Sequence, residues 1–452
     1  MKKMIKLTAL LLMLVMTVGL VCGCTLSSQD VDDEDKVTVT KLTIGLPYGP
    51  DSDAAAGIKQ MIGSIAAEDG FAFYEDAEVT IVTVPEVGTE EYAKFIKKVS
   101  GGDIDFFLAP SSEELEELIE EKKIVENNTI TQRDGRFSDG QIPTFKALSR
   151  ESNRLSYSVP FTGSYQGLFI NTDIFEQNEI EVPTDWASLN AVIPALIEKG
   201  VTPFAAGFAD GTAYWLDEMI LAEGGVAEHS ALPSKGVINS WSRAVNDIKK
   251  FYDAGAFQAD VLSNTHDVAV QQFLNKEAAM MVCSSKDIAT GMDTSTVAYM
   301  SMPKPDTGIK EDNAFIGQSE MGFYFYTKSF TKNVDETTSL SSKMAEFITA
   351  YMASPDWYGE YFEIPGGFPF FTSAEECMDS DLEAAAWEMI SKAETADMPI
   401  SNYLLAYDEL ETGLVQVLEG QVSVDEYLTA VTEAELEAQA AKKEEAKKNK
   451  KN

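Results

Sequence analysis

The sequence is poor in the residues that build catalytic and metal centres. Its 452 residues include two histidines, His229 and His266, and four cysteines. Both histidines lie in polar stretches that we expect to be loops. So few histidines argue against a His-based triad and a three-His zinc site. We therefore predict no catalytic residue, no metal and no cofactor, although a glycosidase carboxylate pair stays open among 74 acidic residues.

Basic residues are also scarce. The chain has 35 Lys and Arg against 74 Asp and Glu, which gives a formal net charge of -39. Such a chain repels the phosphate backbone of nucleic acids and anionic lipid headgroups. We predict that nucleic acid is not a partner, that the acidity serves solubility, and that the protein is a monomer.

Beyond the first two dozen residues there is no apolar run long enough to span a bilayer. The start itself has Lys2, Lys3 and Lys6, then an apolar stretch ending in Val21-Cys22-Gly23-Cys24. This pattern resembles a bacterial lipobox, which implies a signal peptide over 1–23 and a lipid on Cys24. The acidic residues 24–36 read as a tether, so we expect a lipid-anchored protein on the extracellular face of the cell membrane. We expect Cys283 to be a buried free thiol rather than a disulfide partner of Cys377.

The part after the tether alternates between strand and helix patterns. Strands are expected at 37–46, 78–84 and 103–109, each followed by a helix, the third opening with a capping box from Ser111 to Glu114. This βαβαβα order predicts an α/β fold with a mostly parallel sheet flanked by helices. Ligands bind such sheets beyond the carboxyl ends of the strands. The candidates at those ends are Tyr48, Gly49, Ser111 and Ser112.

The stretch 155–171 reads as two apolar runs, 155–161 and 167–171, around the polar patch Thr162–Gln166. Gly163 gives the backbone freedom to bend there. We predict that the chain crosses here, at a hinge, from one α/β body to the next, and that the Tyr165 ring faces a ligand. Phe169 and Phe175 are expected to belong to the core. A second α/β pattern follows over 187–302, and 315–327 repeats a polar patch, Gly317–Glu320, before an aromatic strand.

Several segments in fixed order resemble one family. They include VPFTGSYQGLFINTDIFEQ at 159–177, EKGVTPFAAGFADG at 198–211 with Tyr214-Trp215 after it, and Gly-Gly-Phe-Pro at 366–369. They are similar to the extracellular solute-binding proteins of ABC importers, family 1, the carbohydrate group with maltose-binding relatives.

The resemblance implies a two-lobed periplasmic-binding-protein-like fold of type II. The chain would cross between lobes near 160–167, 317–322 and 366–371. One lobe would hold 37–160 and 318–365, and the other 161–317 and 366–440, before a charged tail at 441–452.

The resemblance also implies a function without catalysis: capture of a sugar or oligosaccharide between the lobes and its delivery to ABC permease subunits. A sugar needs flat aromatic surfaces and fixed polar groups in a pocket. The alternative is a receptor for a polyamine, a metal or a peptide. The candidate ligand-binding residues are Tyr48, Gly49, Ser111, Ser112, Gly163, Ser164, Tyr165, Asp210, Tyr214, Trp215, Ser284, Gln318, Glu320 and Phe368.

Overall fold

The computed structural model describes residues 41–66, 78–126, 142–148, 156–233, 239–288, 294–308, 313–327, 368–369, 378 and 380–449. Contacts divide the chain into Met1–Val37 and Thr38–Asn452, and the fold below belongs to the second unit. The predicted signal segment, Cys24, the tether and Cys377 lie outside the described residues. Among the described helices, none is both long and apolar enough to cross a membrane.

The first part of the fold has the predicted alternation of strands and helices. Parallel strands pair in the order β2-β1-β3. The elements are β1 (Lys41–Leu46), α2 (Asp53–Ala66), β2 (Glu78–Thr83), α3 (Glu90–Gly101), β3 (Phe106–Ala109) and α4 (Glu113–Glu120). One detail of the prediction is wrong: α4 is capped by Ser112, whose side chain accepts from the Leu115 amide, and not by Ser111.

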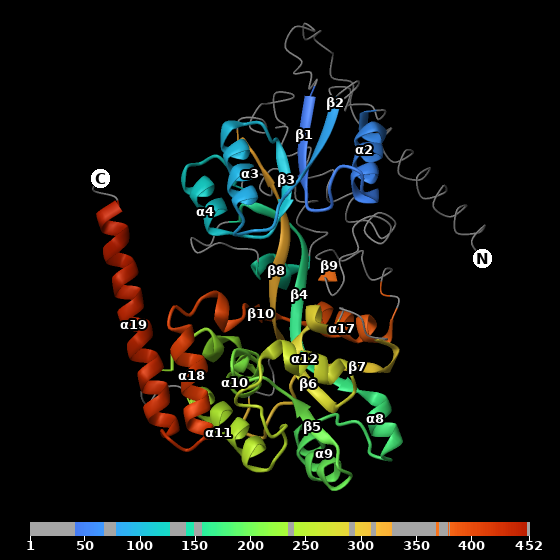
Figure 1. The fold of residues 1–452 in the computed structure, drawn as a ribbon, viewed down its shortest axis with the longest axis vertical. Helices are drawn as coiled ribbons and strands as arrows, with labels where there is room; N and C mark the ends of the chain where they lie inside the picture. Colours follow the sequence, from blue (N-terminus) through green and yellow to red (C-terminus); the bar gives the residue numbers. More distant parts are fainter. Residues whose placement is uncertain are drawn as a thin grey trace, which may run out of the picture. The chain divides into compact units, whose positions relative to one another are not determined.

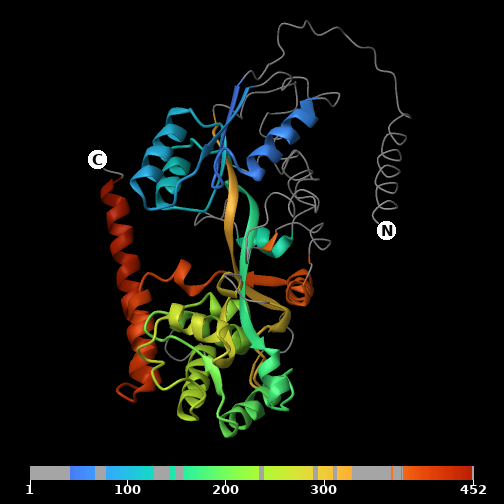
Figure 2. The same cartoon turned by 45° about the vertical axis from the view of Figure 1, so that its right-hand side comes forward.

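Two long strands, β4 (Ser158–Asn171) and β8 (Ala314–Phe325), run side by side through the sheet, as Figures 1 and 2 show. The strand order is β2-β1-β3-β8-β4-β6-β5. Among the described strands of this sheet, β4 or β8 takes part in every antiparallel pairing. All other pairings are parallel. The short β9 (Phe368–Pro369) pairs with β4 at Thr162 and Gly163. The three segments that we expected to cross between lobes are therefore hydrogen-bonded neighbours.

Strand β4 replaces the two separate runs that we predicted on either side of the polar patch Thr162–Gln166. It is one continuous strand of 14 residues, all of them buried. It pairs with β8 over Ser158–Tyr165 and with β6 (Ala278–Ser284) over Gln166–Ile170, with register shifts near Thr162. The polar residues fit inside because side chains alternate between the two faces of a strand.

The second part of the fold surrounds the parallel pair β5–β6. Its alternation of helices and strands agrees with the α/β pattern predicted over 187–302. Its elements are α8 (Thr172–Gln177), α9 (Trp186–Glu198), β5 (Thr202–Ala205), α10 (Thr212–His229), α11 (Asn239–Asp253), α12 (His266–Leu274), β6, α13 (Ser285–Ile288) and β7 (Val297–Met300).

The C-terminal segments pack on this second part. Strand β10 (Thr395–Asp397) pairs with β8, and the 3-10 turn η7 (Ile400–Asn402) follows it. Helix α19 (Val424–Asn449) continues through most of the predicted charged tail. The remaining helices are α7 (Pro143–Leu148), α17 (Asp381–Lys392) and α18 (Tyr407–Leu418).

Candidate functional site

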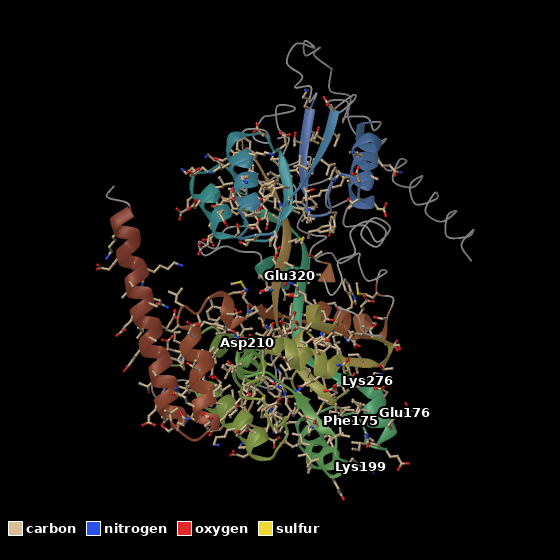
Figure 3. The ribbon with its side chains drawn as sticks, in the orientation of Figure 1. Phe175, Glu176, Lys199, Asp210, Lys276 and Glu320 are labelled. Carbon is tan, nitrogen blue, oxygen red and sulfur yellow. The ribbon has the colours of Figure 1, made fainter. Side chains whose placement is uncertain are left out.

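A cavity of about 360 Å³ is lined by residues of β4, α10, α12, β8, the β6–α13 turn and the 399–407 segment. These segments are far apart in the sequence and come together only in the folded chain. Polar side chains make up most of its wall. One of them is Asp210, which lies just before α10 and is labelled in Figure 3.

Strand β4 contributes Ser164 and Gln166 to the cavity. These residues are two apart and share one face of the strand. Tyr165 lies between them and points to the opposite face, where its ring packs 4.9 Å from the ring of Tyr299 and 6.2 Å from that of Phe169. The alternation therefore separates a polar cavity face from an aromatic core face.

Glu320 of β8 ties three elements together at one side of the cavity. Its Oε1 accepts from Ser164 Oγ at 2.6 Å and from Gln318 Nε2 at 2.7 Å, and its Oε2 accepts from Lys286 Nζ at 2.9 Å. Gln318 in turn accepts from Asn402 Nδ2 at 2.8 Å. These bonds fix the side chains of Ser164, Gln318 and Lys286, which line the cavity, before any ligand arrives.

His266 organises the opposite wall. Its backbone amide donates to Asp210 Oδ1 at 2.6 Å, and its Nε2 lies 3.0 Å from Asp287 Oδ2. Its ring stacks on Tyr214, with the ring centroids 4.2 Å apart and the planes 13° apart. The prediction that both histidines lie in loops is wrong, because His266 begins α12 and His229 ends α10.

The cavity floor is formed by Asp217 and Gln166, both buried. Asp217 Oδ1 accepts from the Ile400 amide at 2.9 Å. Asp217 Oδ2 and Gln166 Oε1 have no hydrogen-bond partner of good geometry within the described chain, although the Gln166 side chain interacts with the Asp217 carboxylate and favours its ionised form. Buried acceptors without donors favour a ligand that brings its own O–H or N–H groups. In the same described part, no three His, Cys, Asp or Glu side chains form a metal-binding group.

A second cavity of about 660 Å³ shares Gln318, Ser401 and Asn402 with the first. It is also lined by Ser111, at the carboxyl end of β3, and by Glu320. Together the two cavities give a polar surface that continues past the Gln318–Asn402 bond. That surface has room for a ligand larger than the first cavity holds.

Residues 56–330 match the family model of the bacterial extracellular solute-binding proteins. The chain belongs to this family. Among curated proteins, no sequence matches it significantly.

Solved structures show the same two-lobed α/β fold. A probable secreted solute-binding lipoprotein from Streptomyces coelicolor is 15% identical with a TM-score of 0.67, covering 89% of this chain and 99% of its own. The GacH receptor of Streptomyces glaucescens, studied with acarbose, is 19% identical and has a TM-score of 0.56. The match covers 88% of this chain and 97% of GacH. RafE from Streptococcus pneumoniae, in complex with raffinose, is 16% identical and has a TM-score of 0.52. The match covers 87% of this chain and 98% of RafE.

The structure of this solute-binding protein brings together part of the predicted site. Ser164, Asp210, Tyr214, Ser284 and Gln318 line the first cavity. Ser111, Gln318 and Glu320 line the second. These residues come from five places in the sequence and meet where the long strands β4 and β8 pass the ends of other elements.

Two predicted aromatic contacts belong to the core instead. Tyr165 is 4% exposed and Trp215 is 1% exposed, and neither lines a cavity described above. Trp215 lies next to Tyr214 on α10, but adjacent helical residues point about 100° apart. One of the two had to face away from the cavity.

The other predicted residues serve the backbone. Gly49 adopts a φ of 71° in the turn after β1, and Ser112 caps α4. Tyr48 packs against the core, and burial raises its pKa to about 12. Gly163 pairs with Ser319 and Phe368 in the sheet, and the Phe368 side chain lies outside the described atoms.

Sequence reasoning missed eight polar side chains that line the first cavity. Two of them carried a signal: Gln166 lies two residues after Ser164 on a strand, and Asp217 lies three after Tyr214 on a helix. The others have no spacing that relates them to the site. The full set is Gln166, Asp217, His266, Lys286, Asp287, Ser401, Asn402 and Tyr407.

Proposed function

We propose that this protein captures a sugar or oligosaccharide in the cavity above Asp217 and delivers it to ABC permease subunits. The observation that carries the proposal is the pairing of unsatisfied acceptors, Gln166 Oε1 and Asp217 Oδ2, with the partly buried ring of Tyr214 in one cavity. A sugar presents hydroxyl donors and apolar C–H faces, which match acceptors and a ring. Structural relatives studied with acarbose and raffinose support this ligand class.

The charges around the cavity favour a neutral ligand over a polyamine or a metal ion. Three carboxylates at the cavities already have a side-chain nitrogen partner within 3.0 Å: Asp217 has His229, Asp287 has His266, and Glu320 has Lys286. Asp210 accepts from the backbone amide of His266. A cation would have to displace these partners, whereas a hydroxyl needs only the free acceptor oxygens. Gene neighbours that encode two permease subunits would support the delivery step.

A thermal-shift screen of the purified protein tests the ligand class. We expect one of a panel of oligosaccharides to raise the melting temperature, with a stabilisation of about 2.7 kcal/mol at a hundredfold excess over Kd. Tyr214→Ala should abolish most of this shift, because the ring supplies the apolar contact. Putrescine and divalent metal ions serve as the competing ligands. A shift with either of them, and none with any sugar, would show that the receptor belongs to another ligand class.

Lipid anchoring at Cys24 is part of the same proposal and rests on the sequence Val21-Cys22-Gly23-Cys24 after an apolar run. Cells supplied with radioactive palmitate should label the wild-type chain and leave Cys24→Ser unlabelled. The matched control is Cys22→Ser, which should keep the label because Cys22 leaves with the signal peptide. Label on Cys24→Ser would place the lipid elsewhere.

A further inference from the structure

A buried histidine links α10 to the segment that follows β10. His229 is fully buried at the end of α10. Its Nε2 lies 2.9 Å from Asp217 Oδ1, and its Nδ1 lies 2.8 Å from Asp397 Oδ2. The two carboxylates come from different elements, α10 and β10. His229 therefore joins the cavity floor to the chain segment that forms one cavity wall.

The kink at Gly225 brings His229 to this position. Gly225 has φ 65° and ψ -176°, inside what would otherwise be a regular helix. This conformation is essentially restricted to glycine. The turn reverses the chain, so that His229 reaches the side chain of Asp217, 12 residues earlier. A continuous helix would place residues 12 apart about 18 Å from each other.

The geometry fits a His229 ring in which both nitrogens carry a proton. An ionised carboxylate only accepts hydrogen bonds, so each of its two partners needs an N–H from the ring. The titratable groups that face the ring are Asp217, Glu218, Asp397 and Tyr403. None of these supplies a competing positive charge.

The pKa values agree with this protonation state. Burial lowers the pKa of His229, but the hydrogen bonds to Asp217 and Asp397 outweigh that effect and raise it to about 9. Burial raises the pKa of Asp217, and the contact with His229 opposes the rise. Burial also raises the pKa of Glu218 to about 7, with the Asp217 charge adding to it. Among the groups around Asp217, the charged imidazole most strongly favours its ionised form.

The same network holds the 397–403 segment. The Ile400 amide donates to Asp217 Oδ1, the oxygen that His229 also contacts, and Tyr403 Oη donates to the His229 carbonyl at 2.9 Å. Pro399, Ser401 and Asn402 of this segment line the cavity. Without His229, the buried carboxylate of Asp217 would face the partly buried carboxylate of Asp397 across the gap, and this wall would lose its anchor.

We propose that His229, as an imidazolium ion, is a positioning residue for ligand binding. It keeps Asp217 ionised, so that the free Oδ2 accepts a hydrogen bond from a ligand hydroxyl, and it fixes the Pro399–Asn402 wall. This role rests on the proposed function, since it gives the ligand contact its acceptor. Its protonation and its structural effect can both be measured without any ligand.

The first test is the nitrogen NMR spectrum of the untagged protein with labelled histidine. The sequence contains two histidines, so His266→Gln assigns both signals. We expect both ring nitrogens of His229 to be protonated at about pH 7, where an ordinary histidine is mostly neutral. Because the pKa is raised to about 9, the signal should change only as the pH rises toward that value. A neutral His229 ring at about pH 7 would overturn the proposal.

The second test is hydrogen exchange in His229→Gln. The Ile400 amide should exchange at least about tenfold faster than in the wild type, because its acceptor is no longer held. His266→Gln, which also loses an imidazole–aspartate pair, should leave this amide unchanged. Unchanged exchange in His229→Gln would contradict the role. If that variant does not fold, Asp397→Asn replaces it and should accelerate the same amide.

The third test uses calorimetry with raffinose, xylotriose and diacetylchitobiose. For whichever sugar the wild type binds, His229→Gln should weaken affinity by about tenfold or more at neutral pH. Wild-type affinity should fall as the pH rises through about 9, and the variant should lack this dependence. Equal affinity of variant and wild type would overturn the positioning role. Failure of the wild type to bind any sugar, with the NMR and exchange results as expected, would instead count against the proposed ligand class.

Discussion

Trp215→Ala should lower the free energy of unfolding by about 3–5 kcal/mol, as large-to-small changes at buried aromatic residues do. Trp215 is 1% exposed, and its ring meets Phe204 and Phe257 edge-on at centroid distances of 5.0 Å each. Its Nε1 has no partner in the described chain, so the loss is one of packing and not of a hydrogen bond. Urea unfolding followed by circular dichroism measures the change.

Tyr214→Ala is the matched control on the same helix. Tyr214 is partly buried and lines the cavity, with its ring stacked on His266. This variant should lose less than half as much stability as Trp215→Ala while losing most of its ligand response. A Trp215→Ala variant of normal stability that fails only to bind would mean that Trp215, and not Tyr214, faces the ligand.

Arg243→Met should also lower the free energy of unfolding by about 3–5 kcal/mol, because it leaves a buried carboxylate without its charged partner. Glu223 of α10 is 1% exposed, and its Oε2 accepts from Arg243 Nε on α11. Thr307 Oγ1 also donates to Glu223, at 3.1 Å, but a hydroxyl cannot balance the charge. The ion pair anchors the helix that carries Tyr214 and Asp217.

The control for this prediction is Lys249→Met on the same helix. Lys249 pairs with Asp253 four residues away, and the Asp253 side chain is 58% exposed. Exposed pairs of this kind contribute about 1 kcal/mol or less. Both variants replace a cation by Met on α11, so the difference between them isolates burial. Similar unfolding midpoints for the two would show that Glu223 is hydrated or protonated in the folded protein.

The fold was largely predictable because hydrophobic periodicity is local. The βαβαβα order of the first part and the helices around β5 and β6 agree with the expected segments. The main error concerned 155–171, where a polar patch was interpreted as separating two strands that are in fact one. Counting the alternation there would have assigned Ser164 and Gln166 to one face and Tyr165 to the other.

The site was less predictable because most of its contacts join distant residues. His229 and Asp397 are 168 residues apart, and Gln318 and Asn402 are 84 apart. No local spacing relates such pairs. The position of His229 depends further on the non-helical Gly225, which interrupts an otherwise helical pattern. The adjacent glycines at 224 and 225 were the available signal for a break in that helix.

The faces of β4 have a consequence for how ligand specificity can evolve in this chain. Phe161, Tyr165 and Phe169 occupy one core, and Leu168 and Ile170 occupy the other, with Ser164 and Gln166 at the cavity between. Insertion or deletion of one residue in β4 would exchange these faces, placing aromatic rings in the cavity and polar groups in the core. Diversification at this strand is therefore confined to substitutions at alternate positions, so its length is fixed while its cavity chemistry can change.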